Sequence, residues 1–223
     1  MAVGYNPKVV IDGLVLALDA GNTKSYPGSG STWTDLIGNN TGTLTNGPTF
    51  SSDNGGYFEL PNSNSYIQLS SPALTTPSTL SVEVWVRITD TSVYSRFLSN
   101  RDSSNDGWEA GFDPTNKWYL QINGLVANIS SATVNQDQWY HVVFHYDGTL
   151  GKIFVDGVQI QNLAFGSQTI NTTTAAAIGA VSHQLSTVQN KFEIGELRVY
   201  NNKALTAAEV LQNYNAHKTR YGH

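Results

Sequence analysis

The feature that most limits the fold of this chain is the alternation of side chains over residues 80–88. One face of this run carries β-branched side chains, namely Val82, Val84, Val86 and Ile88. The other face carries Glu83, Trp85 and Arg87. A two-residue period of β-branched side chains is typical of a strand that packs on a core. We therefore predict a strand in the middle of a sheet.

Runs of the same kind recur between clusters of turn residues. They cover residues 13–19, 57–60, 66–69, 95–99, 108–112, 118–122, 139–146, 152–155, 177–180 and 192–200. Many short strands separated by turns indicate an all-β sandwich. Asp156 and Gly157 stand between two apolar runs and predict a tight type I′ hairpin turn.

One helix is predicted near the C-terminus. Thr206 and Glu209 have the spacing of a capping box, with Thr206 as the N-cap residue. An apolar face follows, formed by Val210, Leu211 and Tyr214. We expect the helix to end near His217 and to pack on the edge or the end of the sandwich.

The predicted domain organisation is simple. A chain of 223 residues suits one large β domain, so we expect a single domain over residues 1–223. Residues 1–12 are expected to form an N-terminal arm. Residues 20–50 are rich in Gly, Ser, Asn, Thr and Pro, and we expect a long ordered loop pinned by Trp33.

Composition excludes several classes of site and partner. The chain has no cysteine, which excludes disulfides and thiolate metal sites. The net charge is −5 at pH 7, so the basic footprint of a nucleic-acid-binding protein is missing. We expect no membrane span, because no long apolar stretch occurs, and no signal peptide, because the N-terminus lacks its pattern.

An ordered series of short motifs extends over roughly residues 55–220. It includes Trp139-Tyr140-His141-Val142-Val143, Tyr146-Asp147-Gly148, Val155-Asp156-Gly157, Ile178-Gly179 and Phe192-Glu193-Ile194-Gly195-Glu196-Leu197-Arg198-Val199-Tyr200. This series resembles laminin-G-like and pentraxin-like domains of the concanavalin-type jelly roll. The resemblance implies an all-β antiparallel sandwich with one short C-terminal helix.

The first 50 residues resemble the opening of tailed-phage structural proteins that carry such a domain. The matching segments are residues 12–20, 25–28, 33–36 and 46–50. The resemblance implies a virion protein on the particle surface, as a capsid decoration or as a tail or fibre component. Residues 1–10 would then dock on other virion proteins. Homo-oligomers are common in such appendages, but no coiled-coil heptads specify one.

Catalysis is not expected from the pattern of carboxylates. Glycoside hydrolases need two carboxylates about 5–9.5 Å apart across the scissile bond. Glu109 and Asp113 share a strand face but would lie ~13 Å apart along it. Glu193 and Glu196 are expected on opposite faces of their strand. The Glu-x-Asp-x-x-Glu series that a hydrolase of the resembling fold would carry does not occur.

Calcium is the one cofactor for which the sequence offers candidate ligands. Asp102 and Asp106 lie in a short acidic turn. A pentraxin-like site would need a second acidic cluster after Ile178-Gly179, and no carboxylate stands there. Because Ca²⁺ takes six to eight oxygen ligands, a solvated turn is favoured over a calcium site.

Two histidines raise the question of zinc. His141 and His145 are four residues apart, which on a strand places them ~13 Å from each other. One ion cannot bind both, so His141 is expected to pack and hydrogen-bond on the sheet.

The aromatic residues give the candidate ligand-binding positions. Trp108 and Trp118 lie near turns and are candidates for an exposed platform on which a sugar ring stacks. Trp85 and Trp139 lie within strand patterns and are expected in the core.

Three functions follow from these observations. The first is a non-enzymatic phage virion protein that decorates the particle and has a glycan-binding, adhesive role. The second is a free lectin-like carbohydrate-binding protein. The third is a glycoside hydrolase of the same fold whose site the sequence does not reveal.

Overall fold

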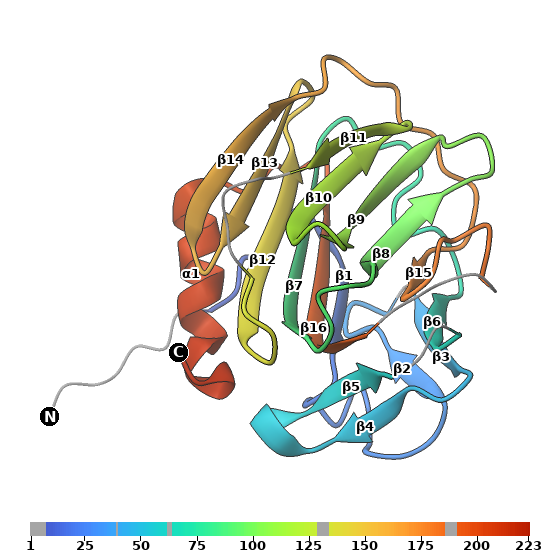
Figure 1. The fold of residues 1–223 in the computed structure, drawn as a ribbon, viewed down its shortest axis with the longest axis vertical. Helices are drawn as coiled ribbons and strands as arrows, with labels where there is room; N and C mark the ends of the chain where they lie inside the picture. Colours follow the sequence, from blue (N-terminus) through green and yellow to red (C-terminus); the bar gives the residue numbers. More distant parts are fainter. Residues whose placement is uncertain (1–7, 39, 62–63, 129–133, 186–190) are drawn as a thin grey trace, which may run out of the picture.

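Two antiparallel sheets packed face to face make up the fold, with one helix outside them (Figure 1). The computed structural model describes residues 8–38, 40–61, 64–128, 134–185 and 191–223. The predicted all-β sandwich jelly roll with one C-terminal helix is confirmed.

The first sheet has the order β14 (Val158–Ala164), β13 (Leu150–Val155), β12 (Trp139–Tyr146), β7 (Leu80–Ile88), β16 (Phe192–Asn201), β5 (Tyr57–Leu60) and β4 (Thr49–Ser51), and β1 (Leu14–Asp19) pairs with β16. The second sheet has the order β11 (Leu125–Asn128), β10 (Lys117–Ile122), β9 (Gly107–Asp113), β8 (Ser95–Arg101), β15 (Ala177–Ile178), β6 (Tyr66–Leu69), β3 (Thr41–Thr45) and β2 (Thr32–Thr34). Short 3-10 turns, η1 (Asp53–Gly55) and η2 (Lys218–Tyr221), complete the elements together with helix α1 (Ala207–His217).

The alternation that predicted strand β7 places it in the middle of the first sheet, between β12 and β16. Its β-branched face points into the core between the sheets, where these side chains are fully buried. Large aromatic side chains fill the same space, including Trp33, Phe58, Phe97, Phe112, Trp118 and Phe144. The type I′ turn is confirmed, because Asp156 and Gly157 have φ angles of 51° and 82°.

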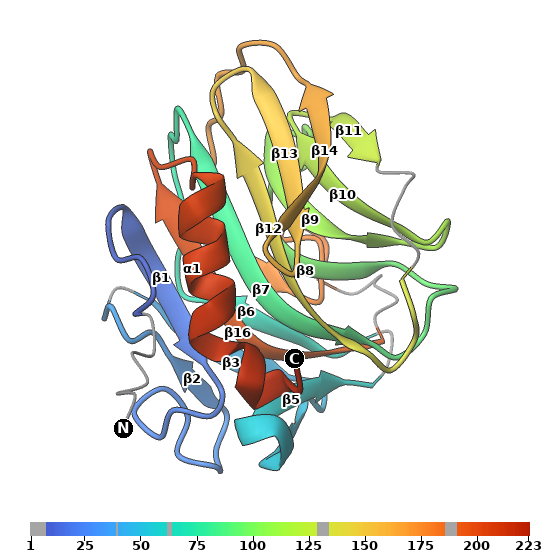
Figure 2. The same ribbon diagram turned by 90° about the vertical axis from the view of Figure 1, so that its left-hand side faces the viewer.

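Helix α1 begins with the predicted capping box. Thr206 accepts a hydrogen bond from the Glu209 backbone, and the Glu209 carboxylate accepts one from the Thr206 backbone. The expectation that the helix packs on the edge or the end of the sandwich is wrong. The helix lies over the outer face of the first sheet (Figure 2). Asn213 joins the two by donating to Glu83 at 2.6 Å. In the described part of the chain, no helix is long and apolar enough to cross a bilayer.

A group of ionised side chains, which we call the buried ionic cluster, lies between α1 and the first sheet. Arg198 donates to Glu83 at 2.7 Å and also to Glu196. Arg220 donates to Glu196 at 2.7 Å, and His217 Nδ1 lies 2.6 Å from the same carboxylate. Both glutamates are fully buried. The helix is therefore attached to the sheet by charge as well as by apolar packing.

A β-bulge at Gly195 brings Glu196 into this cluster. The register between β16 and β7 shifts between Ile194 and Glu196. Glu193 then lies opposite Arg87, and Glu196 lies opposite Trp85, which is on the same face of β7. The expectation that the two glutamates point to opposite faces is wrong, because the bulge adds one residue to the alternation.

Residues 20–50 do not form one long loop. Strands β2 and β3 fall within this stretch, β4 begins in it, and β3 pairs with β6 in the second sheet. The polar composition of the segment concealed these strands, because threonine supplies most of their exposed positions. Trp33 is fully buried in the core, as its predicted anchoring role requires.

The predicted N-terminal arm is attached to α1 where it is described. Val10 is buried, and its backbone N–H donates to Asn213 Oδ1 at 2.8 Å. Gln212 donates to the Lys8 carbonyl at 2.6 Å. The last part of the predicted arm is thus held against α1, and residues 1–7 lie outside the described residues. Docking through this arm stays a prediction.

Candidate functional site

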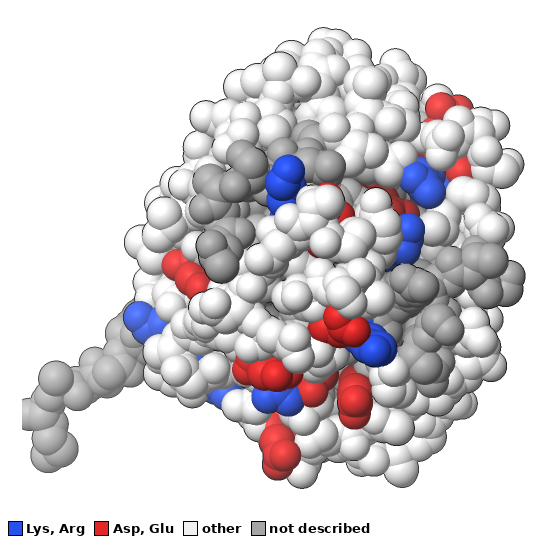
Figure 3. Space-filling view, in the orientation of Figure 1, with Lys and Arg blue, Asp and Glu red and all other residues white. Residues whose placement is uncertain are grey.

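A groove of about 200 Å³ lies on the outer face of the second sheet, over strands β8, β9 and β10. In β9, Trp108, Ala110 and Phe112 point into the core. The outward positions are Gly107, Glu109, Gly111 and Asp113. The two glycines make room for close neighbours, with Gly107 against the Asn100 carbonyl and Gly111 against the Tyr119 ring. Figure 3 views the molecule in the orientation in which β8–β11 face the reader, and charged groups there are few and scattered.

Glu109 lies at the floor of the groove and is 2% exposed. The Tyr119 hydroxyl donates to its Oε1 at 2.5 Å, and Arg96 Nε lies 3.2 Å from the same oxygen. Burial, and then the charge of Glu109, raise the pKa of Tyr119, so Tyr119 stays a hydrogen-bond donor. Gly111 allows this contact, because a Cβ there would come within 2.8 Å of the Tyr119 ring.

Tyr94 and Val126 stand at the mouth of the groove, with 42% and 53% of their surfaces exposed. The Arg96 guanidinium lies over the Tyr94 ring at 4.9 Å. The ring also meets Tyr119 edge to face, with centroids 6.2 Å apart. These contacts hold an exposed aromatic ring beside charged hydrogen-bond donors.

Arg101 forms the other end of the groove, next to Gln121. Its Nη1 donates to Gln121 Oε1 at 2.7 Å, across the glycine at position 107. Arg96 and Arg101 remain partly exposed, whereas Glu109 and Asp113 are 2% and 4% exposed. A ligand that enters the groove thus meets cationic donors more readily than carboxylates.

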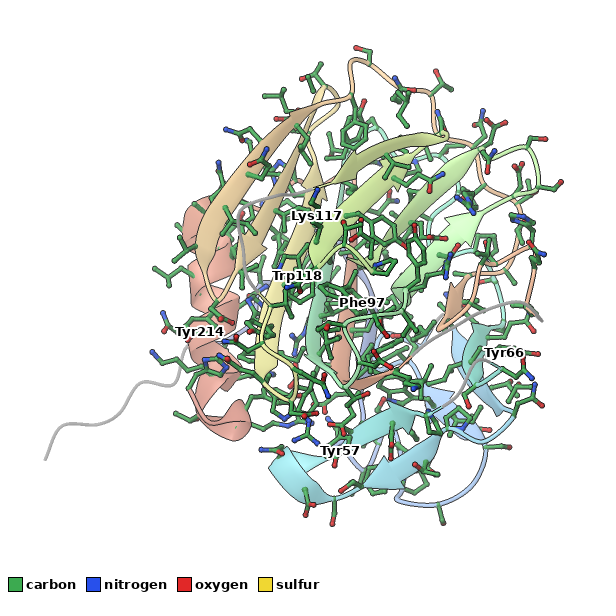
Figure 4. The ribbon with its side chains drawn as sticks, viewed as in Figure 1. Tyr57, Tyr66, Phe97, Lys117, Trp118 and Tyr214 are labelled. Atoms are coloured by element: carbon green, nitrogen blue, oxygen red, sulfur yellow. The ribbon has the colours of Figure 1, made fainter. Side chains whose placement is uncertain are left out.

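The two tryptophans predicted as a sugar platform are not exposed. Trp108 and Trp118 are both 0% exposed, and both belong to the core between the sheets. Figure 4 shows Trp118 near Phe97 in the interior, and their ring centroids are 5.9 Å apart. Nearness to a turn did not expose these side chains, because the strand alternation turns them inward. Trp85 and Trp139 are buried, as predicted.

The acidic turn between β8 and β9 is organised around its own backbone. Asp102 Oδ1 accepts hydrogen bonds from the backbone of Ser104 at 2.8 Å and of Asp106 at 3.0 Å. Asp106 is exposed. Among the described residues, no group of three or more His, Asp or Glu side chains is arranged to hold a metal ion. Asp102 therefore has a structural role in the turn.

The histidines of β12 do not converge. His141 is fully buried between Trp85 and Tyr214, and its Nε2 lies 3.2 Å from Glu83 Oε1. His145 contacts the Leu205 carbonyl at 3.0 Å through Nδ1. The predicted packing role of His141 is confirmed.

The pair of carboxylates on β9 is committed to local contacts. Asp113 Oδ1 accepts from the Thr115 backbone at 2.9 Å, from the Thr115 hydroxyl at 2.7 Å and from the Lys117 backbone at 3.2 Å. Glu109 is held by Arg96 and Tyr119. Each carboxylate thus stabilises the protein around it.

Sequence reasoning did not assign Tyr94, Arg96, Arg101, Tyr119 or Gln121 to a site. A bulge in β8, between Arg96 and Leu98, breaks the alternation that would have placed its side chains. A usable signal was present in β9, where two glycines flank Glu109 at outward positions. Glycine within a strand often marks the close approach of another group.

The sequence comparisons identify the family. A profile of the concanavalin A-like lectin/glucanases superfamily matches residues 61–211, about two thirds of the chain. The chain belongs to this superfamily, as the series of motifs implied. A search of curated proteins finds no sequence match.

Solved structures share the fold at low sequence identity. The binding domain of Paraclostridial Mosquitocidal Protein 1 is 15% identical with a TM-score of 0.71, and the match covers 92% of this chain and 52% of that one. The receptor-binding domain of botulinum neurotoxin type G is 18% identical with a TM-score of 0.65, covering 91% and 51%. This chain thus spans about half the length of both. Domain 4 of AbnA, an extracellular arabinanase from Geobacillus stearothermophilus solved with arabinotriose, is 18% identical with a TM-score of 0.69, covering 90% and 98%.

Proposed function

We propose that this chain is a non-enzymatic carbohydrate-binding domain, and that a sugar binds in the groove over β8, β9 and β10. The observation that carries the proposal is the exposed Tyr94 ring at the mouth of a polar groove. Aromatic rings offer an apolar surface to the C–H face of a sugar, and a few fixed polar groups then select its hydroxyls. Membership of a superfamily of lectins and glucanases, and the arabinotriose complex of the similar AbnA domain, support this proposal.

The absence of catalysis is part of the proposal. A hydrolase needs one carboxyl group as an acid and a second as a base or nucleophile. In the groove, Glu109 is paired with Arg96, and Asp113 is occupied by the turn after β9. Neither carboxylate is placed to exchange a proton with a ligand. Release of reducing ends from any polysaccharide in a broad panel would contradict this.

Replacing Tyr94 with alanine tests the site. Loss of the ring is expected to weaken binding about tenfold, because aromatic contacts contribute roughly 0.5–1.5 kcal/mol beyond the area that they bury. A glycan array on the unmodified protein identifies the ligand, and titration calorimetry measures the change. Leu211→Ala is the control, because Leu211 is 47% exposed on α1, over the opposite sheet. A flat array, or equal affinity of both variants, would count against the proposal.

The virion role is a second candidate, and it rests on the resemblance of the first 50 residues to phage structural proteins. A decoration or tail protein could use the same groove for adhesion to surface glycans. The test is whether the native protein co-purifies with particles at a fixed copy number. Its absence from purified particles would leave the free lectin-like protein as the better interpretation.

A further inference from the structure

We propose that the groove selects a sugar that carries a carboxylate, and that the guanidinium of Arg101 pairs with this group. The inference rests on the proposed function and adds the class of ligand to it. Its basis is that Arg96 is paired with a carboxylate within the groove, whereas Arg101 is paired only with an uncharged amide.

The two arginines of the groove differ in their partners. Arg96 lies 3.2 Å from the Glu109 carboxylate, which neutralises it. Arg101 donates to the amide oxygen of Gln121 at 2.7 Å, and within the described residues its side chain forms no ion pair with a carboxylate. A partly buried cation that lacks a counterion is stabilised by any anion that can reach it.

Two carboxylates at the ends of the groove, those of Asp102 and Asp113, are held by their own turns. Asp102 is next in sequence, but its Oδ1 is occupied by two backbone N–H groups of the turn. Asp113 stands at the far end of β9, opposite Lys117 of β10, and serves its own turn. Lys117, which Figure 4 labels, adds a further positive charge at that end. The groove thus presents cations on a chain whose net charge is −5.

The geometry of Arg101 suits a carboxylate. A guanidinium is a planar fork that can donate two parallel hydrogen bonds to the two oxygens of one carboxylate. Gln121 holds Nη1 and thereby fixes the orientation of the fork. Tyr94, at the opposite end of the same groove, would receive the apolar face of another ring of the same oligosaccharide. Uronic acids and sialic acids both combine a sugar ring with a carboxylate.

The test compares matched acidic and neutral sugars on the unmodified protein. Oligogalacturonate and its methyl ester have the same rings, and only the first is charged. We expect the acid to bind at least about tenfold more tightly, because a hydrogen bond to a charged group contributes roughly 1.5–3 kcal/mol. The preference should fall as NaCl is raised, since salt screens a partly exposed pair. A second pair, 3′-sialyllactose and lactose, distinguishes a sialic acid from a uronic acid as the source of the carboxylate.

Arg101→Gln should bring the ratio of acid affinity to ester affinity close to one, while Arg101→Lys should retain part of the preference. If acid and ester bind equally, and Tyr94→Ala weakens both, the acid selectivity is wrong and the proposed function stands. If neither pair of sugars binds, the acid selectivity is wrong, and the glycan array alone decides the proposed function. The comparison of acid with ester needs no variant, so it remains decisive even if Arg101→Gln does not fold.

Discussion

Replacing Arg198 with methionine is expected to lower the free energy of unfolding by about 3–5 kcal/mol, the cost of leaving a buried charge without its partner. Arg198 donates to Glu83 at 2.7 Å and also contacts Glu196, and both carboxylates are fully buried. Methionine keeps most of the volume, so the loss measures charge more than packing. For a chain of this size the melting temperature should fall by roughly 10 °C, which thermal and denaturant unfolding would both detect.

Lys191→Met is the matched control for this substitution. Lys191 pairs with Asp90 at 3.0 Å, but its side chain is 49% exposed. An exposed pair contributes about 0–1 kcal/mol, so the control should change little. Similar small losses in the two variants would show that water already solvates the buried ionic cluster.

The same cluster should make the protein sensitive to acid. Burial alone would raise the pKa of Glu83, but the charge of Arg198, followed by His141, outweighs it and lowers the pKa to about 2. The pKa of Glu196 is also lowered, because Arg198 and His217 outweigh its burial. A carboxylate with a depressed folded-state pKa contributes stability above its unfolded pKa, near 4.5, and loses it as the pH falls toward 2. Glu83 alone then contributes about 3 kcal/mol at neutral pH. Unfolding energies measured from pH 7 to pH 2 should fall steeply below pH ~4.5 and more gently in Arg198→Met.

Replacing Trp118 with alanine is the second large effect that we expect. The loss of a buried tryptophan should cost about 3–5 kcal/mol, from lost transfer energy and from the cavity that remains. The ring packs edge to face on Phe112 and Tyr140, with centroids 5.4 and 5.5 Å away. Differential scanning calorimetry should show the loss directly.

Trp118→Phe separates the core role of this side chain from a role in binding. The indole Nε1 makes no hydrogen bond to the described residues, so phenylalanine keeps the aromatic packing that this core position requires. We expect a loss of about 1–2 kcal/mol and unchanged affinity for sugar. A folded Trp118→Phe protein that fails to bind would contradict the assignment of Trp118 to the core alone.

Local patterns predicted those features that depend on neighbouring residues. The capping box placed the start of α1 at Thr206, and the Asp156-Gly157 pair gave the hairpin turn. Strand β3 was missed because its pairing with β6 joins residues far apart in sequence. Strands β2 and β4 pair with β3 and β5, and their polar composition concealed them. Period-two reasoning failed where a bulge interrupts it, at Gly195 and after Arg96.

The candidate groove was beyond sequence reasoning for the same physical cause. Its residues come from four strands and from the loop before β8, and they are brought together by register, which no local pattern encodes. Tyr94 and Arg96 precede the β8 bulge, and Arg101 follows it, so a simple alternation assigns them to different faces. The sequence drew attention to Glu109 only as a possible catalytic partner of Asp113, a pairing that their separation along the strand excludes. The partners that neutralise it, Arg96 and Tyr119, became visible only in the structure.

The two ends of the described chain lie together on one side of the molecule. Lys8 and Val10 are hydrogen-bonded to Gln212 and Asn213 of α1, which covers the outer face of the first sheet (Figures 1 and 2). The groove opens on the outer face of the second sheet. A surface joined to α1 or to residues 8–10 would therefore lie on the side of the molecule opposite the groove. If the groove binds sugar as proposed, many copies fixed in this way would present their grooves in the same direction, and weak single contacts would add to a strong collective one.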